Sequence, residues 1–431
     1  MLADINSLMP YDAMTLGNHE FDDGCEATAG FVRAQPYPVL AANLDARLGC
    51  PLRGTPFRPW IIKEVRGVKV GIVGLANPSV RRLSAACPET WFYKSETTLK
   101  KAVAELEKQG VRHIIAVTHL GLPKDLELAR SVDGVDIIVG GHTHDYLGPK
   151  SSKGPYPIVE HSPSGKPVLV VTAGALAKYL GQLDVTFDAQ GVPVRWQGEA
   201  LPLDASIPPD PAVEAKIAQY AQKLEAFTSV TVGQNNLTAP DGLHQCRIGE
   251  CLSGLIATDS MLDYGRSYGA QAAIINGGGL RAPLRQGALN LGDMLAVLPF
   301  GNKVIIRDFS GEQLLAALEH GVADYKGVGS PLLHTAGLRY VYNPALPSGK
   351  RIVRAELLDA GGAARPLDPA ARYRVVLVDY LERRGDGYAM LAKGSPVEAP
   401  DPVDVDVLAA YIKKFSPLTA LPPDRLIRQT N

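Results

Sequence analysis

The sequence has little net charge and no long apolar run, and both absences exclude classes of protein. Its 44 Lys and Arg residues nearly balance 45 Asp and Glu residues, for a formal net charge of -1. No global field therefore attracts nucleic acid or an acidic surface, and an anionic ligand must be held by a few local arginines or metals. Because no stretch reaches about 18 consecutive apolar residues, we do not expect a membrane span. No internal repeat or low-complexity tract is visible.

Cysteine is also scarce. The five cysteines, at positions 25, 50, 87, 246 and 251, are too few and too scattered for a disulfide framework. Cys246 and Cys251 are close enough in sequence to form a bridge, but we favour the interpretation that both are buried free thiols. The first four residues show neither a basic leader nor an apolar run, so no signal peptide is expected in this chain.

The composition is otherwise ordinary for a globular protein, with 46% apolar and 21% charged residues. A length of 431 residues predicts two domains, each large enough for its own core. Residues 1–200 alternate short β-branched runs with amphipathic stretches, which predicts a layered α/β domain. The expected strands lie in 37–42, 68–73, 113–117, 135–139 and 168–171, and a covering helix is expected over 96–109.

A proline-rich stretch separates this domain from the rest of the chain. Four prolines between 202 and 211 forbid a continuous helix or strand there, which indicates a linker, and a helix should follow over 212–227. We assign 201–229 to the linker and connecting helix. Residues 230–431 form a second domain of the α+β class, in which Ser310 and Gln313 make a helix capping box.

Three segments of the first domain carry metal-binding side chains at expected strand ends. They are Gly17 to Asp22 (GNHEFD), Val117 to His119 (VTH) and Gly140 to His144 (GGHTH). Imidazoles and an amide oxygen are suitable ligands for divalent metals, and the glycines allow a close approach of the backbone. Any one of these segments alone could be a turn with loop histidines. Their combination favours a metal site.

The second domain carries residues that suit an anion and a flat ring. Asn276 to Arg281 (NGGGLR) follows an apolar run, and Arg281 can hold a phosphate with its two-pronged guanidinium. Phe300, Asn302, Tyr380 and Asp386, taken one by one, are equally typical of a protein core and a turn.

Taken together, these segments resemble the 5'-nucleotidase family of two-domain metallophosphoesterases. Residues 11–22 match the motif of that family's first domain. The segments 118–119, 140–144, 246–250 (CRIGE), 276–281, 299–302 (PFGN) and 385–388 (GDGY) follow in the family's order. The resemblance covers residues 11 to about 391. It implies a layered α/β metallophosphoesterase sandwich followed by an α+β nucleotide-binding domain.

The resemblance also implies a role for each motif residue. One divalent metal ion would be held by Asn18, His119 and His142 and a second by His144, with Mn, Zn or a similar metal at both sites. His19 with Asp22 would form the dyad that stabilises the transferred phosphate. On the phosphate and ribose side, the nucleotide would be bound by Arg247, Asn276, Gly278 and Arg281. Its base would lie between the rings of Phe300 and Tyr380. Asn302 and Asp386 would contact the base or the ribose. Tyr380 stands where the family usually has Phe, which keeps the ring and adds a hydroxyl.

The implied activity is metal-dependent hydrolysis of nucleotide phosphate esters in nucleotide catabolism and salvage, in a periplasmic or secreted protein. The metal ligands and the base-binding residues fall in different domains, so we also expect hinge closure, with the helix after the linker as the pivot.

The sequence departs from the family's pattern at its start. Family members begin with a strand that ends in Asp-x-His-Gly and a second that ends in Gly-Asp, and neither segment is present before residue 11. We therefore expect a chain shortened by a late start codon or by fragmentation. With four of seven expected ligands, it should hold at most one metal ion tightly, and its activity stays open.

Two alternatives remain. A related hydrolase could act on nucleotide sugars, 2',3'-cyclic nucleotides or even thiosulfate, although the rings of Phe300 and Tyr380 favour a nucleobase and argue against thiosulfate. A protein of another class would bind nucleotides without catalysis. The sequence identifies neither the preferred base nor the oligomeric state.

Overall fold

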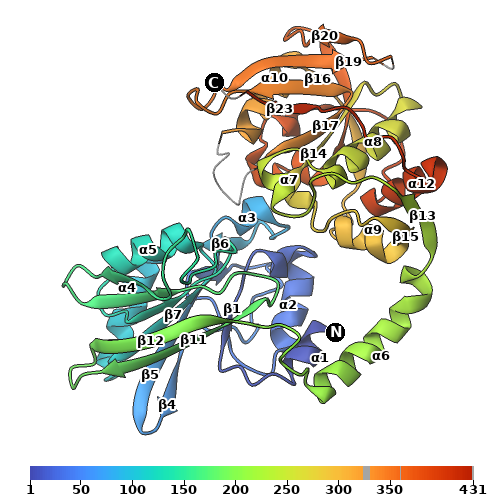
Figure 1. Cartoon of the computed structure of the whole chain (residues 1–431). Helices are drawn as coiled ribbons and strands as arrows, with labels where there is room; N and C mark the ends of the chain where they lie inside the picture. The colour runs from blue at the N-terminus through green and yellow to red at the C-terminus, as the bar shows by residue number, and fades with distance from the viewer. Residues whose placement is uncertain (324–330, 360, 430–431) are drawn as a thin grey trace. The chain divides into compact units, whose positions relative to one another are not determined.

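The computed structural model of the chain describes residues 1–323, 331–359 and 361–429. It divides into two compact units, Met1–Tyr220 and Ala221–Asn431, and Figure 1 shows the elements of each. Each unit has its own buried hydrophobic core, as the chain length predicts. The fold class predicted from the alternation of strands and helices is confirmed.

A six-stranded sheet with the order β4-β5-β7-β8-β10-β9 is the centre of the first unit. Its four inner strands are parallel, and antiparallel β4 and β9 close the two edges. The strands are β4 (Trp60–Val65), β5 (Val68–Leu75), β7 (His113–Thr118), β8 (Ile137–Val139), β9 (Ile158–His161) and β10 (Pro167–Val171). Four of the predicted apolar runs lie wholly or partly in the inner strands, and most apolar residues of these strands are buried.

Smaller elements complete the first unit. The predicted run 37–42 contains only the short strand β2 (Val39–Leu40), which pairs in parallel with β1 (Met14–Thr15). The strands β3 (Leu44–Ala46) and β6 (Thr90–Phe92) form one antiparallel pair, and β11 (Tyr179–Phe187) and β12 (Pro193–Pro202) form another. The helices are α1 (Leu2–Asn6), α2 (Gly24–Ala34), α3 (Val80–Leu83), α4 (Ser95–Lys108) and α5 (Leu122–Ser131). The predicted covering helix is α4, and α6 (Pro211–Thr228) confirms the helix expected after the proline-rich stretch.

The second unit contains two larger sheets. One has the order β17-β14-β21-β16-β22 and the other β20-β19-β18-β23, while β13 pairs with β15. The strands are β13 (Thr231–Asn235), β14 (Ala272–Asn276), β15 (Gly287–Asn290), β16 (Val304–Ser310), β17 (Leu333–Ala336), β18 (Leu338–Tyr342), β19 (Ile352–Leu358), β20 (Ala364–Pro366), β21 (Arg372–Val378), β22 (Ser395–Pro396) and β23 (Leu426–Arg428). The helices are α7 (Gln245–Ile248), α8 (Leu252–Arg266), α9 (Leu291–Val297), α10 (Gly311–Gly321), α11 (Asp379–Glu382) and α12 (Asp404–Phe415). The predicted capping box of Ser310 and Gln313 opens α10.

The cysteines correct one sequence-based interpretation. Cys246 and Cys251 form a disulfide with their Cα atoms 5.1 Å apart, so the preference for two free thiols was wrong. The short helix α7 folds the chain back between them, which brings the two Cα atoms into bridging range. A second disulfide joins Cys25 to Cys87, 62 residues later, and Cys50 is a buried free thiol. Across the described ranges, no helix is long and apolar enough to cross a membrane.

Parallel pairing aligns the ends of three strands of the first sheet. Leu75 of β5 pairs with Thr118 of β7, and Val117 pairs with Val139 of β8. The carboxyl ends of these strands therefore meet at one edge of the sheet. Residues that directly follow β7 and β8 leave the sheet side by side, which is the position that ligand-binding residues occupy in parallel sheets.

The buried carboxyl group of Asp136 yields a prediction about stability. Its Oδ2 atom accepts a hydrogen bond from the backbone N–H of Ile114 at 2.8 Å, yet burial raises the pKa of Asp136 from 3.8 to about 7. The folded chain therefore keeps a proton that the unfolded chain loses near pH 4. Stability should fall as the pH rises through this window, by roughly 1.4 kcal/mol for each unit of pKa shift.

An Asp136→Asn variant removes this titration. Urea unfolding between pH 4 and 8 should show that the variant gains stability over the wild type as the pH rises. Glu105→Gln, which removes a half-exposed carboxylate that pairs with Lys108 on α4, is the matched control, and its stability should depend on pH as that of the wild type does. Parallel stability curves for the wild type and Asp136→Asn would contradict the assignment.

Candidate functional site

Three predicted metal ligands meet at the aligned strand ends of the first unit. The side-chain oxygen of Asn18 lies 3.1 Å from Nε2 of His119 and 3.1 Å from Nδ1 of His142. The two imidazole rings lie with their centroids 5.0 Å apart. We call Asn18, His119, His142 and the neighbouring His144 the imidazole cluster. The structure thus brings together residues that are 124 positions apart in the sequence.

The local sequence explains why these side chains can approach. A Cβ atom at Gly17 would lie 2.9 Å from the ring of His119, so only glycine fits before Asn18. His142 and His144 adopt positive φ angles of 79° and 59°, which L-residues rarely adopt. Such strained backbone persists only where the surrounding structure enforces it, and it is concentrated at functional sites.

The electrostatics of His119 reflect the crowding of imidazoles. Its pKa is lowered to about 3, first by burial and then by the charges that His142, His19 and His144 would carry. His119 is therefore neutral at physiological pH. A neutral imidazole offers a free lone pair, which is the form that binds a metal ion.

The predicted dyad lies beside this cluster. Nδ1 of His19 donates to Oδ2 of Asp22 at 2.7 Å, and the His19 side chain is about half exposed (46%). The other oxygen of Asp22 accepts a hydrogen bond from Ser84 at 2.5 Å. Asp22 therefore fixes the orientation and tautomer of His19 and directs its Nε2 atom away from the carboxylate. The contact of Ser84 with Asp22 could not be predicted from the sequence, because nothing in the pattern around Ser84 is distinctive.

A buried carboxyl group supports both histidine-bearing segments. Asp125 of α5 is fully buried, and its Oδ1 atom accepts a hydrogen bond from Thr118 at 2.5 Å. Its Oδ2 atom has no hydrogen-bond partner among the described residues, and a Cβ atom at Gly140 would lie 2.2 Å from it. Burial raises the pKa of Asp125 to about 7. Sequence analysis overlooked this residue, although an acid within the apolar stripe of a helix is a recognisable signal.

The donor set of the imidazole cluster fits a divalent metal ion. Imidazole nitrogens and an amide oxygen suit Zn, Mn and related metals. Donor atoms 3.1 Å apart match the spacing expected of neighbouring ligands that each lie roughly 2.0–2.2 Å from one ion. Asn18, His119 and His142 could hold such an ion without large rearrangement. His144 lies near enough to His119 for its charge to lower the pKa of that residue.

The second unit places two arginines close together. Arg247 belongs to α7, and its pKa is lowered to about 10, first by burial and then by the charge of Arg281. Arg281 donates to the carbonyl of Gly278 at 3.2 Å, and its guanidinium carbon lies 5.5 Å from the centroid of the Phe300 ring. We call Arg247 and Arg281 the arginine pair. The repulsion between these two half-buried charges is offset in part by Asp386, and a bound phosphate would offset it further, so the pair could hold a phosphate.

Asp386 connects the remaining predicted residues to this pair. Its carboxylate accepts hydrogen bonds from Asn276 at 2.7 Å and from the Tyr380 hydroxyl at 2.8 Å. Its charge also acts on Arg247. Asn302 instead donates to the buried Asp404 at 3.2 Å, so its amide has a structural partner outside this network. His320, which sequence analysis missed, donates to the backbone carbonyl of Asp386 at 2.8 Å.

Comparison with known proteins agrees with this geometry. Residues 1–146 match the family described as calcineurin-like phosphoesterase, and residues 229–393 match the 5'-nucleotidase C-terminal domain. The snake venom 5'-nucleotidase of Naja atra is 33% identical over 434 residues, which cover 95% of this chain and 82% of that protein. The 5'-nucleotidase of Bos taurus is 32% identical, and the match covers 97% of this chain and 76% of that protein. The crystal structure of the 5'-nucleotidase precursor from Thermus thermophilus has a TM-score of 0.93 and 36% identity, and covers 100% of this chain and 86% of that one.

The two family matches, one in each part of the chain, identify a two-domain metallophosphoesterase. Membership in this class implies divalent metal ions. The extent of the match to the relatives identifies the family more closely: the chain belongs to the 5'-nucleotidase family.

The hydrogen bond between Tyr380 and Asp386 leads to a prediction that distinguishes the contribution of the Tyr380 ring to nucleoside binding from that of its hydroxyl group. Tyr380→Phe keeps the ring and removes the hydroxyl, whereas Tyr380→Ala removes both. If the ring stacks on a nucleobase, Tyr380→Ala should weaken adenosine binding by about 1–3 kcal/mol, while Tyr380→Phe should stay close to the wild type. Isothermal titration calorimetry with adenosine measures both. An equal loss in the two variants would assign the effect to the hydroxyl, and no loss in either would remove Tyr380 from the base site.

Proposed function

We propose that this protein hydrolyses the phosphate ester of nucleoside 5'-monophosphates with the help of divalent metal ions. The observation that carries the proposal is the convergence of Asn18, His119 and His142 on one point, with the His19–Asp22 pair beside it. Family membership supports the same reaction, because the relatives named above are 5'-nucleotidases.

In this proposal the imidazole cluster holds the metal. Asn18, His119 and His142 would bind one ion of Mn, Zn or a similar metal, and His144 would serve a second. When bound, divalent ions lower the pKa of water and polarise a phosphoryl oxygen. The ion bound by Asn18, His119 and His142 should be held most tightly, because it has three protein ligands. We therefore expect the 431-residue chain to retain one equivalent of divalent metal. Asp125 accepts a hydrogen bond from Thr118, next to His119, and lies close against Gly140 of the segment that carries His142.

His19 acts on the phosphate rather than on the metal. Its Nδ1 atom is occupied by Asp22, so Nε2 is the atom that can donate a proton toward the developing charge. The carboxylate of Asp22 fixes the orientation and tautomer of the imidazole ring. Ser84 holds Asp22 in turn.

The second unit would recognise the nucleotide. The arginine pair suits the 5'-phosphate, and the fixed carboxylate of Asp386 can accept hydrogen bonds from ribose hydroxyls. The rings of Phe300 and Tyr380 offer faces for the base, and Gly278 allows the ligand to approach the backbone. Asn302 contributes less directly in this proposal, because its amide is bonded to Asp404.

The alternatives receive no comparable support. The relatives' names do not favour a hydrolase of nucleotide sugars, cyclic nucleotides or thiosulfate. A catalytically inactive nucleotide-binding protein remains the alternative of another class, and an assay of phosphate release distinguishes it. We further infer a role in nucleotide catabolism outside the cytosol. Two disulfides support it, since such bonds persist in oxidising compartments.

Replacement of His19 tests the proposed mechanism. His19→Ala should lower the rate of phosphate release from adenosine 5'-monophosphate by about 100- to 1000-fold, because it removes one transition-state donor. Bound metal, measured by elemental analysis, should stay near the wild-type content. His161→Ala, at an exposed position of β9, is the matched control and should retain full turnover.

Three results would change the account. Wild-type turnover in His19→Ala would remove His19 from the mechanism. Loss of metal from this variant would make His19 a ligand. Absence of phosphate release by the wild-type chain with divalent metal present would favour the nucleotide-binding alternative.

A further inference from the structure

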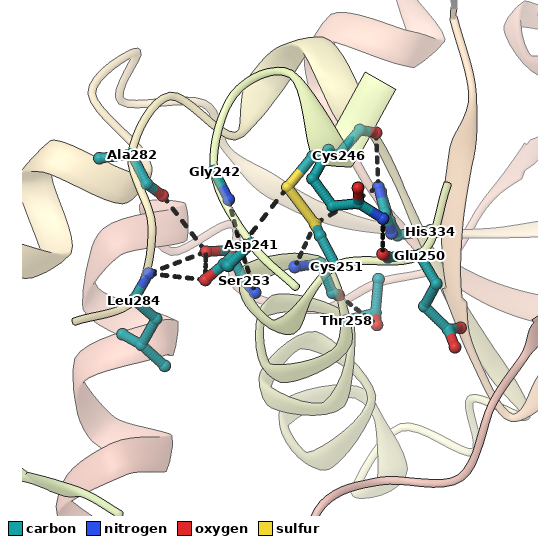
Figure 2. Close-up of a disulfide and its surroundings, with 12 residues drawn as sticks. Asp241, Gly242, Cys246, Glu250, Cys251, Ser253, Thr258, Ala282, Leu284 and His334 are labelled. Atoms are coloured by element: carbon teal, nitrogen blue, oxygen red, sulfur yellow. Dashed lines mark hydrogen bonds between the residues drawn. A yellow bond between two sulfur atoms is a disulfide. The ribbon is translucent and has the colours of Figure 1, made fainter. Parts of the chain in front are cut away.

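Arg247 lies inside a loop that a disulfide closes. The bond between Cys246 and Cys251 joins residues five positions apart, and Arg247 directly follows the first of them. Figure 2 shows the bond at the start of α8, beside His334. Both cysteines are buried, with at most 2% of either residue exposed. The covalent closure therefore belongs to the interior of the second unit, and the side chain of Arg247 extends from it.

Hydrogen bonds fix both ends of this loop. Nε2 of His334, on β17, donates to the carbonyl of Cys246 at 2.8 Å, as Figure 2 shows. The side chain of Gln245 donates to the carbonyl of Glu250 at 2.8 Å. At the other end, Sγ of Cys251 accepts a hydrogen bond from the backbone N–H of Gly254 and caps α8. Each cysteine is thus held by an element of the second unit's core.

The packing around the carbonyl of Cys246 leaves little freedom. A Cβ atom at Gly277, in the NGGG turn, would lie 2.0 Å from this carbonyl oxygen. A Cβ atom at Gly254 would lie 2.2 Å from Nδ1 of His334. The backbone at Cys246 is therefore enclosed between the NGGG turn and His334, which packs against α8. Because Arg247 is the next residue, this enclosure sets where its side chain begins.

Arg247 needs such a support. Arg247 is partly buried, and the charge of Arg281 lowers its pKa, while Asp386 acts in the opposite direction. Burial and the repulsion from Arg281 both favour movement of the side chain toward solvent, while the charge of Asp386 opposes that movement. A flexible loop would allow that movement, whereas a closed loop opposes it and keeps the arginine pair assembled before the ligand arrives. Assembly before binding raises affinity, because the ligand does not have to order the site.

We propose that the Cys246–Cys251 disulfide is a positioning element for Arg247, so that the affinity for a nucleoside 5'-phosphate depends on the redox state of this bond. The proposal rests on the proposed function, since it takes Arg247 as a phosphate-binding residue. It assigns the disulfide no contact with the substrate.

Reduction by a dithiol tests the role of the bond. A thiolate of the dithiol attacks one sulfur atom and forms a mixed disulfide, and the second thiolate then displaces the cysteine. Both cysteines end as thiols, and the dithiol ends as a cyclic disulfide. The hydrogen bonds of His334 and Gln245 can remain, but the covalent closure between residues 246 and 251 is gone. Arg247 then belongs to an open loop.

The experiment compares a ligand that has a phosphate with one that lacks it. Calorimetry with EDTA present measures the binding of adenosine 5'-monophosphate and of adenosine to the full chain, before and after treatment with dithiothreitol. Reduction should weaken binding of the monophosphate about ten-fold, in the range of a lost hydrogen bond to a charged group. Adenosine affinity should change by less than about two-fold, because adenosine carries no phosphate for Arg247 to bind.

Matched variants assign the effect to one disulfide. The double variant Cys246→Ser with Cys251→Ser should bind the monophosphate as weakly as the reduced wild type and should not respond to the dithiol. The double variant Cys25→Ser with Cys87→Ser removes the other disulfide and should keep the full response. The proposal would be overturned if the effect of reduction on monophosphate affinity disappeared in the Cys25/Cys87 variant and persisted in the Cys246/Cys251 variant. It would also be overturned if reduction weakened the binding of adenosine and of the monophosphate equally. Unchanged monophosphate binding after reduction would overturn it too.

A second measurement uses only the wild-type chain. Because coupling between ligand and bond is reciprocal, the monophosphate must stabilise the disulfide by the same ten-fold factor. The midpoint potential of the Cys246–Cys251 bond should therefore fall by about 30 mV when the monophosphate is saturating, and adenosine should not shift it. An equal midpoint with and without the monophosphate would contradict the proposal. If the oxidised chain binds neither ligand, the proposed function fails, and this inference falls with it.

Discussion

The candidate site depends on the parallel pairing of β5, β7 and β8. Thr118 pairs with Leu75, and Val117 pairs with Val139, so the segments that carry His119 and His142 leave the sheet next to each other. A slip of one residue would turn every side chain of a strand to the opposite face. The buried apolar faces of these strands make such a slip unfavourable. The register of the core therefore fixes the spacing of the imidazole cluster.

Both units use burial to hold charged or polar groups in a state that suits a ligand. In the first unit, burial keeps His119 neutral and ready to bind a metal. In the second, Arg247 and Arg281 are held close despite their like charges, and Asp386 is bonded by Asn276. In the proposed function, a cation bound in the first unit and an anion bound in the second would make these arrangements more favourable.

Much of this arrangement could be predicted from the sequence, and the failures have physical causes. Buried strands are recognisable as β-branched runs, and the ligand motifs stand where those runs end. The Cys25–Cys87 disulfide could not be predicted, because the sequence does not reveal which distant segments meet. The contact of Asn302 with Asp404 was hidden for the same reason. Hinge closure and the role of each site residue stay predictions, since the structure describes the two units separately.

X-ray absorption spectroscopy of the oxidised chain, loaded with one equivalent of Zn²⁺, shows whether the imidazole cluster binds the metal. Two sulfur-rich groups, Cys25 with Cys50 and Cys87, and Cys246 with Cys251 and His334, could attract zinc if their disulfides were reduced, so the chain is kept oxidised and only Cys50 offers a free thiol. If the imidazole cluster is the metal site, zinc should show only nitrogen and oxygen neighbours at about 2.0–2.2 Å, with the scattering pattern of imidazole rings. Replacing His119 and His142 with alanine should abolish that pattern. A sulfur shell at about 2.3 Å would contradict the assignment of the metal to the strand ends of the first unit.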